Sequence, residues 1–245
     1  MEFTALLAQG NVFSDFFQSL YDNIIADGRY MYYIEGLGIT LLITLFAGLL
    51  GILIGLLVAV VKVSALNNRK NIILKILNKI CDAYLAVFRG TPIMVQLAIF
   101  ALVIFAGTPI PRIWVAVISM GINSGAYVSE TIRAGIMAID KGQMEASRSL
   151  GLGTWPTYRY IILPQAFKNI LPPLGNEFIA LLKETAIVST IAVVDLFKAY
   201  SKIFAQTFNL FVPLLTVAAI YFIVVMIMNA GLKRMERWLR RSDNR

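Results

Sequence analysis

The chain alternates between long apolar stretches and short segments that hold most of its lysines and arginines. Apolar stretches of about 20 residues are long enough to cross the hydrocarbon core of a bilayer as an α-helix. The pattern therefore predicts an all-α integral membrane protein with five transmembrane helices. Their approximate ranges are 34–63, 72–106, 113–137, 175–197 and 211–232.

Glycines recur along the first of these stretches. Gly48, Gly51 and Gly55 fall on roughly one face of a helix over 34–63. Small residues let membrane helices approach closely, because packing rather than hydrophobic burial drives their association in lipid. We interpret this face as a contact between helices and not as a binding site.

Prolines interrupt two of the apolar stretches. Gly90-Thr91-Pro92 lies inside 72–106, where proline removes a backbone donor and clashes with the preceding turn. We expect one kinked and tilted helix there, with two short half-helices as the alternative. Pro172-Pro173 is expected to break the chain before the helix over 175–197.

The division of the chain follows its charges. Residues 1–32 form an acidic lead, in which apolar positions at helical spacing indicate a short amphipathic helix in the membrane interface; an irregular tail is the alternative. Residues 33–237 form the transmembrane domain, and 238–245 a basic cytoplasmic tail. An odd number of spans places the termini on opposite sides. The excess of lysine and arginine after the first span and in the tail predicts an outer N-terminus and an inner C-terminus, although Lys198 and Lys202 in an outer connection oppose this weakly.

Composition supports the membrane class. Hydrophobic residues make up 58% and charged residues 15% of the chain, whereas soluble domains carry about a quarter charged residues. The formal net charge of +8 is explained by membrane topology better than by nucleic-acid binding, since the basic residues lie between and after the apolar runs.

Several kinds of chemistry are excluded by the residues present. Cys81 is the single cysteine, which rules out an internal disulfide and a multi-cysteine metal site. The chain has no histidine, so triads, proton relays and metal sites based on histidine are absent. It also lacks a Gly-x-x-x-x-Gly-Lys-[Ser/Thr] phosphate-binding loop. We therefore expect no catalytic residues, metal or cofactor in this chain, and energy for uphill transport has to come from a partner.

A polar segment over about 138–165 carries the most specific pattern. Glu145-Ala146-Ser147, Gly151 and then Ile161-Ile162-Leu163-Pro164 resemble the EAA loop of permease subunits in ABC importers. One departure is Thr185-Ala186-Ile187, where the family pattern has Thr-Ser-Leu. Further segments similar to the polar amino acid branch of that family, of histidine, arginine or glutamine type, are 88–93, 127–136, 141–146 and 176–185.

The resemblance implies the type I ABC importer permease fold, with the EAA loop as a cytoplasmic coupling helix. It implies a multi-pass protein of the bacterial inner membrane that imports polar amino acids, with cationic ones as candidates, and forms the translocation pathway as a dimer. The implied partners are cytoplasmic ABC ATPase subunits that bind ATP and Mg²⁺, a second permease subunit, and an extracytoplasmic amino acid-binding protein. The sequence determines neither the amino acid nor whether the second permease is an identical or a sister chain.

Residues in the loop suit a docking role toward the ATPase. Ala146 and Gly151 are small enough to let a short helix enter a groove, and a glycine at the helix end adopts a left-handed conformation without strain. Glu145 is suited to the positive end of its helix and could also pair with an arginine of the partner. The alternative is that its charge stabilises only its own helix. The predicted coupling residues are Glu145, Ala146, Ser147, Arg148 and Gly151.

Charged residues at membrane depth are candidates for substrate binding, because a charge at a helix centre costs about 2.5–3.5 kcal/mol on insertion scales. Glu130, with Ser129 or Asn123 beside it, is suited to accept from the ammonium of an amino acid, and Arg89 to donate to its carboxylate. The alternative is a structural network in which Arg89, Glu130 and Arg133 neutralise one another. That structural role is favoured for Arg133, and also for Lys183 and Glu184.

A self-sufficient, ion-coupled secondary carrier is the rival function, since such carriers also use broken helices and intramembrane carboxylates. They usually contain two related halves, and the sequence shows no internal repeat. A non-transporting membrane scaffold would leave the pattern from Glu145 to Pro164 unexplained.

Overall fold

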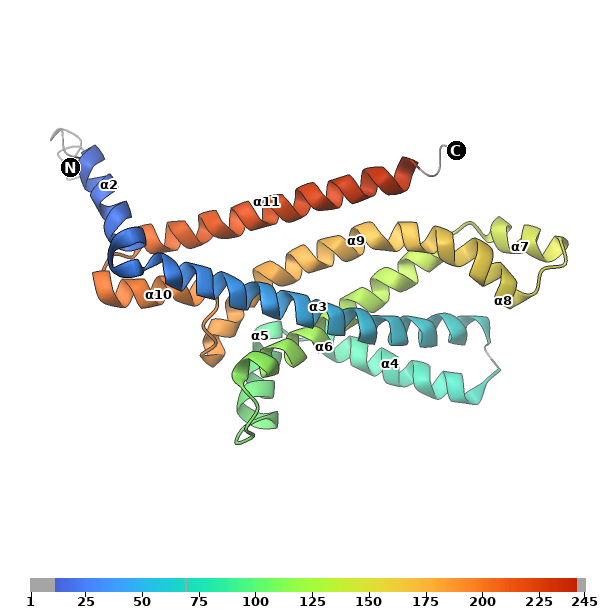
Figure 1. The fold of residues 1–245 in the computed structure, drawn as a ribbon. Helices are drawn as coiled ribbons and strands as arrows, with labels where there is room; N and C mark the ends of the chain where they lie inside the picture. The colour runs from blue at the N-terminus through green and yellow to red at the C-terminus, as the bar shows by residue number, and fades with distance from the viewer. Residues whose placement is uncertain (1–11, 69, 242–245) are drawn as a thin grey trace, which may run out of the picture.

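The computed structural model describes residues 12–68 and 70–241, and this part of the chain is helical without any strand. The long helices α3, α9 and α11 extend along one direction, and α6 packs against both α3 and α9 (Figure 1). The helices are α2 (Val12–Leu20), α3 (Tyr30–Asn67), α4 (Ile72–Gly90), α5 (Ile93–Ile99), α6 (Arg112–Met137), α7 (Lys141–Ser149), α8 (Thr154–Thr157), α9 (Leu163–Glu184), α10 (Leu196–Thr207) and α11 (Phe211–Arg241). Short 3₁₀ or π segments adjoin them at Tyr21–Ile25, Ala26–Gly28, Phe100–Ile104, Tyr158–Ile162 and Thr185–Ile191.

Within the described residues, α3 and α11 are long and apolar enough to cross a membrane, and α4 with α5 supplies a third crossing if that bent pair is one span. The more polar helices α6 and α9 are not identified as spans by length and apolarity alone. The apolar helices thus make the chain a multi-pass membrane protein. The total of five spans and the orientation remain predictions.

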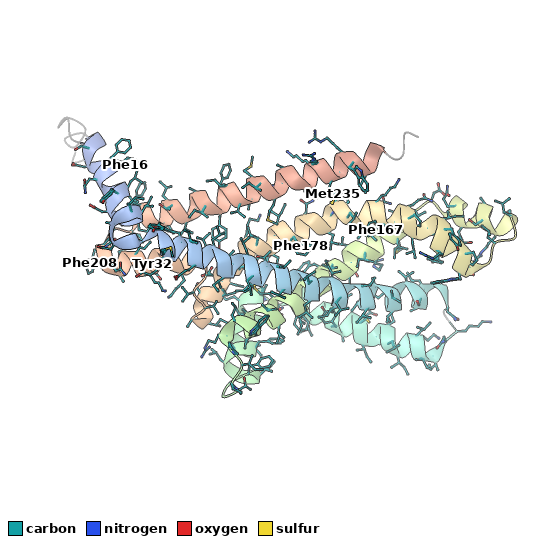
Figure 2. All side chains as sticks on the ribbon, viewed as in Figure 1. Phe16, Tyr32, Phe167, Phe178, Phe208 and Met235 are labelled. Atoms are coloured by element: carbon teal, nitrogen blue, oxygen red, sulfur yellow. The ribbon has the colours of Figure 1, made fainter. Side chains whose placement is uncertain are left out.

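The glycine face of α3 is confirmed as a contact between helices. A Cβ atom added at Gly51 would lie 2.7 Å from the Ser124 hydroxyl oxygen, and one at Gly55 would lie 2.5 Å from a methyl carbon of Val128 on α6. At Gly48 the added atom would lie 2.4 Å from the ring of Phe178, which α9 contributes (Figure 2). Only glycine permits these approaches, so the seam fixes α6 and α9 against α3.

The main apolar core lies where α3, α5, α6, α9 and the segment Thr185–Ile191 meet. Ile43, Leu97 and Met120 are completely buried in it, and Leu181 and Val188 complete the contact. A second cluster, around Tyr33, Leu196 and Val217, joins α3 to α10 and α11. These two clusters hold the long helices together. Many leucines, isoleucines and phenylalanines of α3 and α11 face outward and are exposed, which suits contact with lipid or with a partner subunit.

The stretch 72–106 is not one kinked helix. It forms the half-helices α4 and α5, whose axes differ by 107° across Thr91-Pro92. Pro92 has an extended ψ of 134° and precedes the first residue of α5, so the chain leaves α4 and starts a new helix instead of bending one. The alternative of two half-helices is therefore the correct one.

The predicted break at Pro172-Pro173 is wrong, because α9 runs through both prolines from Leu163 to Glu184. Membrane helices tolerate proline where neighbouring helices hold the segment. Gly135 of α6 provides such support: a Cβ atom there would lie 2.4 Å from Ile170, just before the two prolines.

The lead segment forms α2, which confirms a helix over the apolar positions and excludes an irregular tail for residues 12–20. Phe16 of α2, Tyr32 of α3 and Phe208 after α10 lie at one end of the molecule (Figure 2). The Asn209 amide donates to the Ser19 hydroxyl at 2.8 Å, which ties the lead to the corner between α10 and α11. Residues 1–11 of the predicted lead and 242–245 of the predicted tail lie outside the described residues.

Candidate functional site

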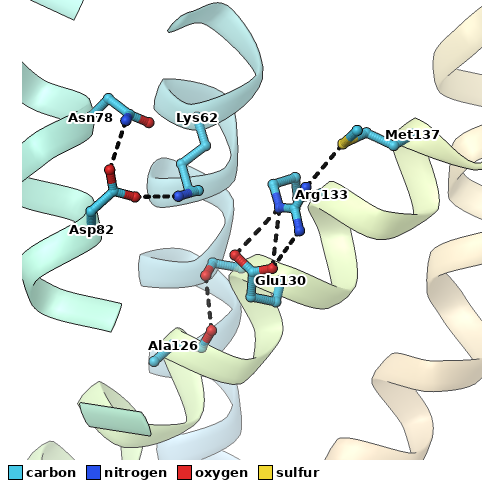
Figure 3. A network of polar contacts seen from close by, with 8 residues as sticks. Lys62, Asn78, Asp82, Ala126, Glu130, Arg133 and Met137 are labelled. Atoms are coloured by element: carbon cyan, nitrogen blue, oxygen red, sulfur yellow. Dashed lines mark hydrogen bonds and ion pairs between the residues drawn. The ribbon is translucent and has the colours of Figure 1, made fainter. Parts of the chain in front are cut away.

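Helix α6 presents an ion pair between Glu130 and Arg133, one turn apart (Figure 3). The Arg133 guanidinium donates to the Glu130 carboxylate from Nη2 at 2.7 Å and from Nε at 3.1 Å. The side chains remain 29% exposed for Arg133 and 22% for Glu130, so the pair lies at a surface of this chain and is not sealed in its core. Part of the structural network considered for Glu130 is thus present, while its carboxylate stays accessible.

A second ion pair lies nearby between α3 and α4. Lys62 Nζ lies 2.5 Å from Asp82 Oδ1, and the Asn78 amide donates to the other carboxylate oxygen at 2.8 Å (Figure 3). Lys62 also attracts Glu130 electrostatically, although its short contact is with Asp82. The Glu130 carboxylate therefore sits in a locally positive field made by residues of three helices.

Arg89 is the penultimate residue of α4, close to the break, and is exposed. Its guanidinium carbon lies 5.6 Å from the centroid of the Tyr127 ring on α6, a cation–π arrangement. Arg89 also interacts electrostatically with Glu130 and with Glu177 of α9, but forms no ion pair with the described residues. Its five N–H donors are consequently available to a carboxylate from outside the chain.

Two of the predicted substrate residues point into the protein. Asn123 is 5% exposed, and its amide donates to the Phe88 carbonyl and to Gln96 Oε1. Ser129 is completely buried, and its hydroxyl donates to the Ala126 carbonyl at 2.9 Å. Arg89 and Glu130 are thus both accessible and interact electrostatically, whereas Asn123 and Ser129 are buried and hydrogen-bonded within the protein.

Glu177 is a residue to which the sequence analysis assigned no binding role. It is half-buried on α9 and interacts electrostatically with Glu184 and Arg89, without an ion pair among the described residues. The available sequence signal was a carboxylate in the middle of an otherwise apolar segment, which is costly in lipid unless protein, water or ligand covers it.

The predicted coupling segment forms α7, which lies with α8 at the opposite end of the molecule from α2 and α10 (Figure 1). Asp140 caps its first turn by accepting from the Gly142 N–H at 2.7 Å. Ser147 is 2% exposed and faces inward, whereas Glu145, Ala146 and Arg148 are exposed.

Glu145 has no ion-pair partner among the described residues. It lies in the second turn of α7, where the helix dipole acts only weakly. Its charge is therefore free to meet a basic group of another protein.

The end of α7 is fixed by Gly151. This residue has φ of +79°, and the N–H groups of Gly151 and Leu152 donate to the carbonyls of Arg148 and Ser147. The pattern is a Schellman motif, which favours glycine because most side chains strain the left-handed backbone. The predicted left-handed glycine is confirmed. Leu150, beside it, is 81% exposed, so the turn presents an apolar side chain at its tip.

No group of three or more cysteine, aspartate or glutamate side chains in residues 12–68 and 70–241 is arranged to hold a metal ion.

Comparison with protein families matches residues 51–241 to the family described as "binding-protein-dependent transport system inner membrane component". The chain is 41% identical over 212 residues to the arginine transport system permease protein ArtQ of Bacillus subtilis, covering 86% of this chain and 93% of ArtQ. It is 39% identical over 165 residues to the glutamine transport system permease protein GlnP of Escherichia coli, covering 66% of this chain and 75% of GlnP.

Solved structures show the same similarity. A chain of an amino acid ABC transporter crystallised with histidines is 43% identical and superimposes with a TM-score of 0.77, covering 85% of this chain and 94% of that one. A chain of the inward-facing MetNI methionine ABC transporter has a TM-score of 0.70 at 21% identity, covering 88% of this chain and 99% of that one, and supports the fold alone.

Proposed function

The chain belongs to the family of binding-protein-dependent transport system inner membrane components, and we propose that it is the permease subunit of an ATP-driven importer of polar amino acids. Relatives named for arginine and glutamine transport support an amino acid as the substrate. The observation that carries ATP coupling is α7: a short, exposed helix with a free carboxylate, ended by a glycine turn, at one end of the membrane helices.

The proposed assembly pairs this permease with a second permease, identical or sister, and with two cytoplasmic ATPase subunits. An extracytoplasmic binding protein delivers the amino acid. The exposed apolar sides of α3 and α11 leave surface for lipid and for the second permease. Rocking of the two permeases, driven by closure of the ATPases around ATP and Mg²⁺, alternates access to the pathway.

The substrate meets two opposite charges, Arg89 near the end of α4 and Glu130 on α6. Arg89 donates to its carboxylate, and Glu130 accepts from its ammonium or from a cationic side chain. Both groups are accessible and lie within electrostatic reach of each other. Asn123 and Ser129 do not contact the substrate in this proposal, because their donors are already engaged within the protein.

The substrate class is tested by ATP hydrolysis. The permease is purified with its ATPase, reconstituted in lipid with the binding protein, and exposed to each amino acid in turn. We expect one or a few polar amino acids to stimulate hydrolysis severalfold and apolar amino acids to have no effect. Stimulation by none, or equally by all, would contradict the proposed specificity.

The orientation of the chain is tested by cysteine labelling in a Cys81→Ser background. Asn68 and Gln18 are exposed and lie beyond opposite ends of α3. We expect Asn68→Cys to react with an impermeant maleimide only from the cytoplasmic side and Gln18→Cys only from the outside. Reaction of both from one side would contradict the outer N-terminus and inner C-terminus.

A further inference from the structure

The break between α4 and α5 leaves backbone groups that need partners. A helix end leaves its last carbonyl groups without intrahelical donors, and Pro92 contributes no N–H to the next turn. In lipid an unsatisfied backbone group is strongly unfavourable, because no water is present to form the missing hydrogen bond. The 107° change of direction is therefore stable only if side chains supply the missing donors.

Gln96, in the first turn of α5, supplies these donors. Its amide nitrogen lies 3.0 Å from the Phe88 carbonyl oxygen, 3.1 Å from the Thr91 carbonyl oxygen and 2.7 Å from the Thr91 hydroxyl. The Thr91 hydroxyl in turn donates to the Val87 carbonyl at 2.8 Å. Gln96 is 5% exposed, so water does not replace these contacts readily.

Asn123 connects this arrangement to α6. Its amide nitrogen lies 3.1 Å from the Phe88 carbonyl oxygen and 2.8 Å from Gln96 Oε1. Phe88 directly precedes Arg89, and Tyr127 follows Asn123 by one turn on α6. The hydrogen bonds thus link the backbone that carries Arg89 to the helix that carries its aromatic contact.

We propose that Gln96 and Asn123 are positioning residues, which hold the end of α4 against α6 and thereby place the Arg89 guanidinium where it receives the substrate carboxylate. The inference rests on the carboxylate role proposed above for Arg89. Neither side chain touches the substrate, since both are buried and fully engaged at the break. Loss of either amide side chain therefore lets the Arg89 guanidinium move from this position, although its charge remains.

The test compares binding of an amino acid and of its α-carboxamide, in which the carboxylate charge is absent. Arginine and glutamine, each beside its carboxamide, are titrated onto the purified permease–ATPase complex by isothermal calorimetry. The binding protein is left out because it would select the carboxylate itself. For the wild type and at least one of the two amino acids, we expect at least tenfold tighter binding of the free acid, or about 1.4 kcal/mol.

Asn123→Ala is expected to weaken binding of the acid about tenfold, to leave the carboxamide nearly unchanged and so to reduce the preference. Gln96→Met, which keeps the length of the side chain but removes its donors, is expected to act in the same direction and serves if Asn123→Ala does not assemble. Ser119→Ala is the matched control: Ser119 is buried on α6 one turn before Asn123, and its hydroxyl has no partner in the described part of the chain. It should keep the wild-type preference.

Arg89→Ala separates the two proposals. If it abolishes the preference while Asn123→Ala and Gln96→Met retain it, the positioning inference is overturned and the role of Arg89 stands. If the wild type shows no preference, or binds neither amino acid, the carboxylate role of Arg89 fails and the inference fails with it. Equal weakening of acid and carboxamide by Asn123→Ala and Gln96→Met would indicate a general structural role and would also overturn the inference.

Discussion

A permease with Gly151→Val and Glu145→Lys is expected to insert and dimerise normally and to import no measurable substrate. Both residues are exposed on or just after α7, outside the apolar helices, so the transmembrane packing does not depend on them. Valine at φ of +79° is strained and disrupts the Schellman turn, while lysine reverses the charge offered to the ATPase. The measurement is co-purification of the ATPase together with substrate uptake in vesicles.

Conformation and charge are separated by a matched variant. Asparagine tolerates the left-handed conformation and glutamine keeps the shape of Glu145, so Gly151→Asn with Glu145→Gln preserves the turn and removes only the charge. We expect this variant to retain part of the uptake. Normal uptake and normal ATPase binding by the Gly151→Val, Glu145→Lys permease would show that α7 is not the coupling site.

Glu130→Gln is expected to weaken substrate affinity by about tenfold to a hundredfold, most for a cationic amino acid. Loss of a charge-assisted contact in a partly dehydrated site is worth on the order of 1–3 kcal/mol. Glutamine keeps the size of the side chain, so the packing of α6 should change little. Affinity is measured by titration of the purified permease–ATPase complex, with expression and assembly as controls.

The ion pair with Arg133 provides the comparison that distinguishes the two roles of Glu130. If Glu130 contacts the substrate, Arg133→Gln should weaken binding much less than Glu130→Gln, because the acceptor remains. If Glu130 serves only the ion pair, the two variants and their combination should give the same result. Equal effects would thus assign Glu130 to the structural network.

The parts of the fold that follow local rules could be predicted from the sequence. The glycine face of α3 depends on helical spacing and small size, and the left-handed turn at Gly151 depends on the backbone freedom of one residue. The long apolar stretches around α3 and α11 predict membrane helices because length and hydrophobicity suffice there.

Other parts depend on contacts between distant residues. Helix α9 continues through Pro172 and Pro173 because α6 packs against it. Rules for proline in helices consider only neighbouring residues in the sequence, so they do not predict this. The sequence places Lys198 and Lys202 in an outer connection, whereas the structure forms α10 there. Asp195 caps it by accepting from the N–H groups of Phe197 and Lys198, a signal that the sequence does contain.

In the candidate site, too, some features follow from residue type and position, and others depend on contacts between distant residues. Charges in apolar surroundings indicate Arg89 and Glu130, which interact electrostatically in the structure, and Arg89 contacts Tyr127 of α6. Residue type alone does not reveal that Asn123 faces the break and Gln96 lies beside it, because an amide side chain suits a substrate and a free backbone carbonyl equally well.

The most direct test of the account is the energy source for uptake. The permease, its ATPase and its binding protein are reconstituted in liposomes, and entry of the amino acid that best stimulates hydrolysis is followed with ATP, with a non-hydrolysable analogue, or with an imposed proton or sodium gradient. We expect accumulation against a gradient only with ATP on the ATPase side. Accumulation driven by an ion gradient without ATP would contradict it and would indicate a secondary carrier.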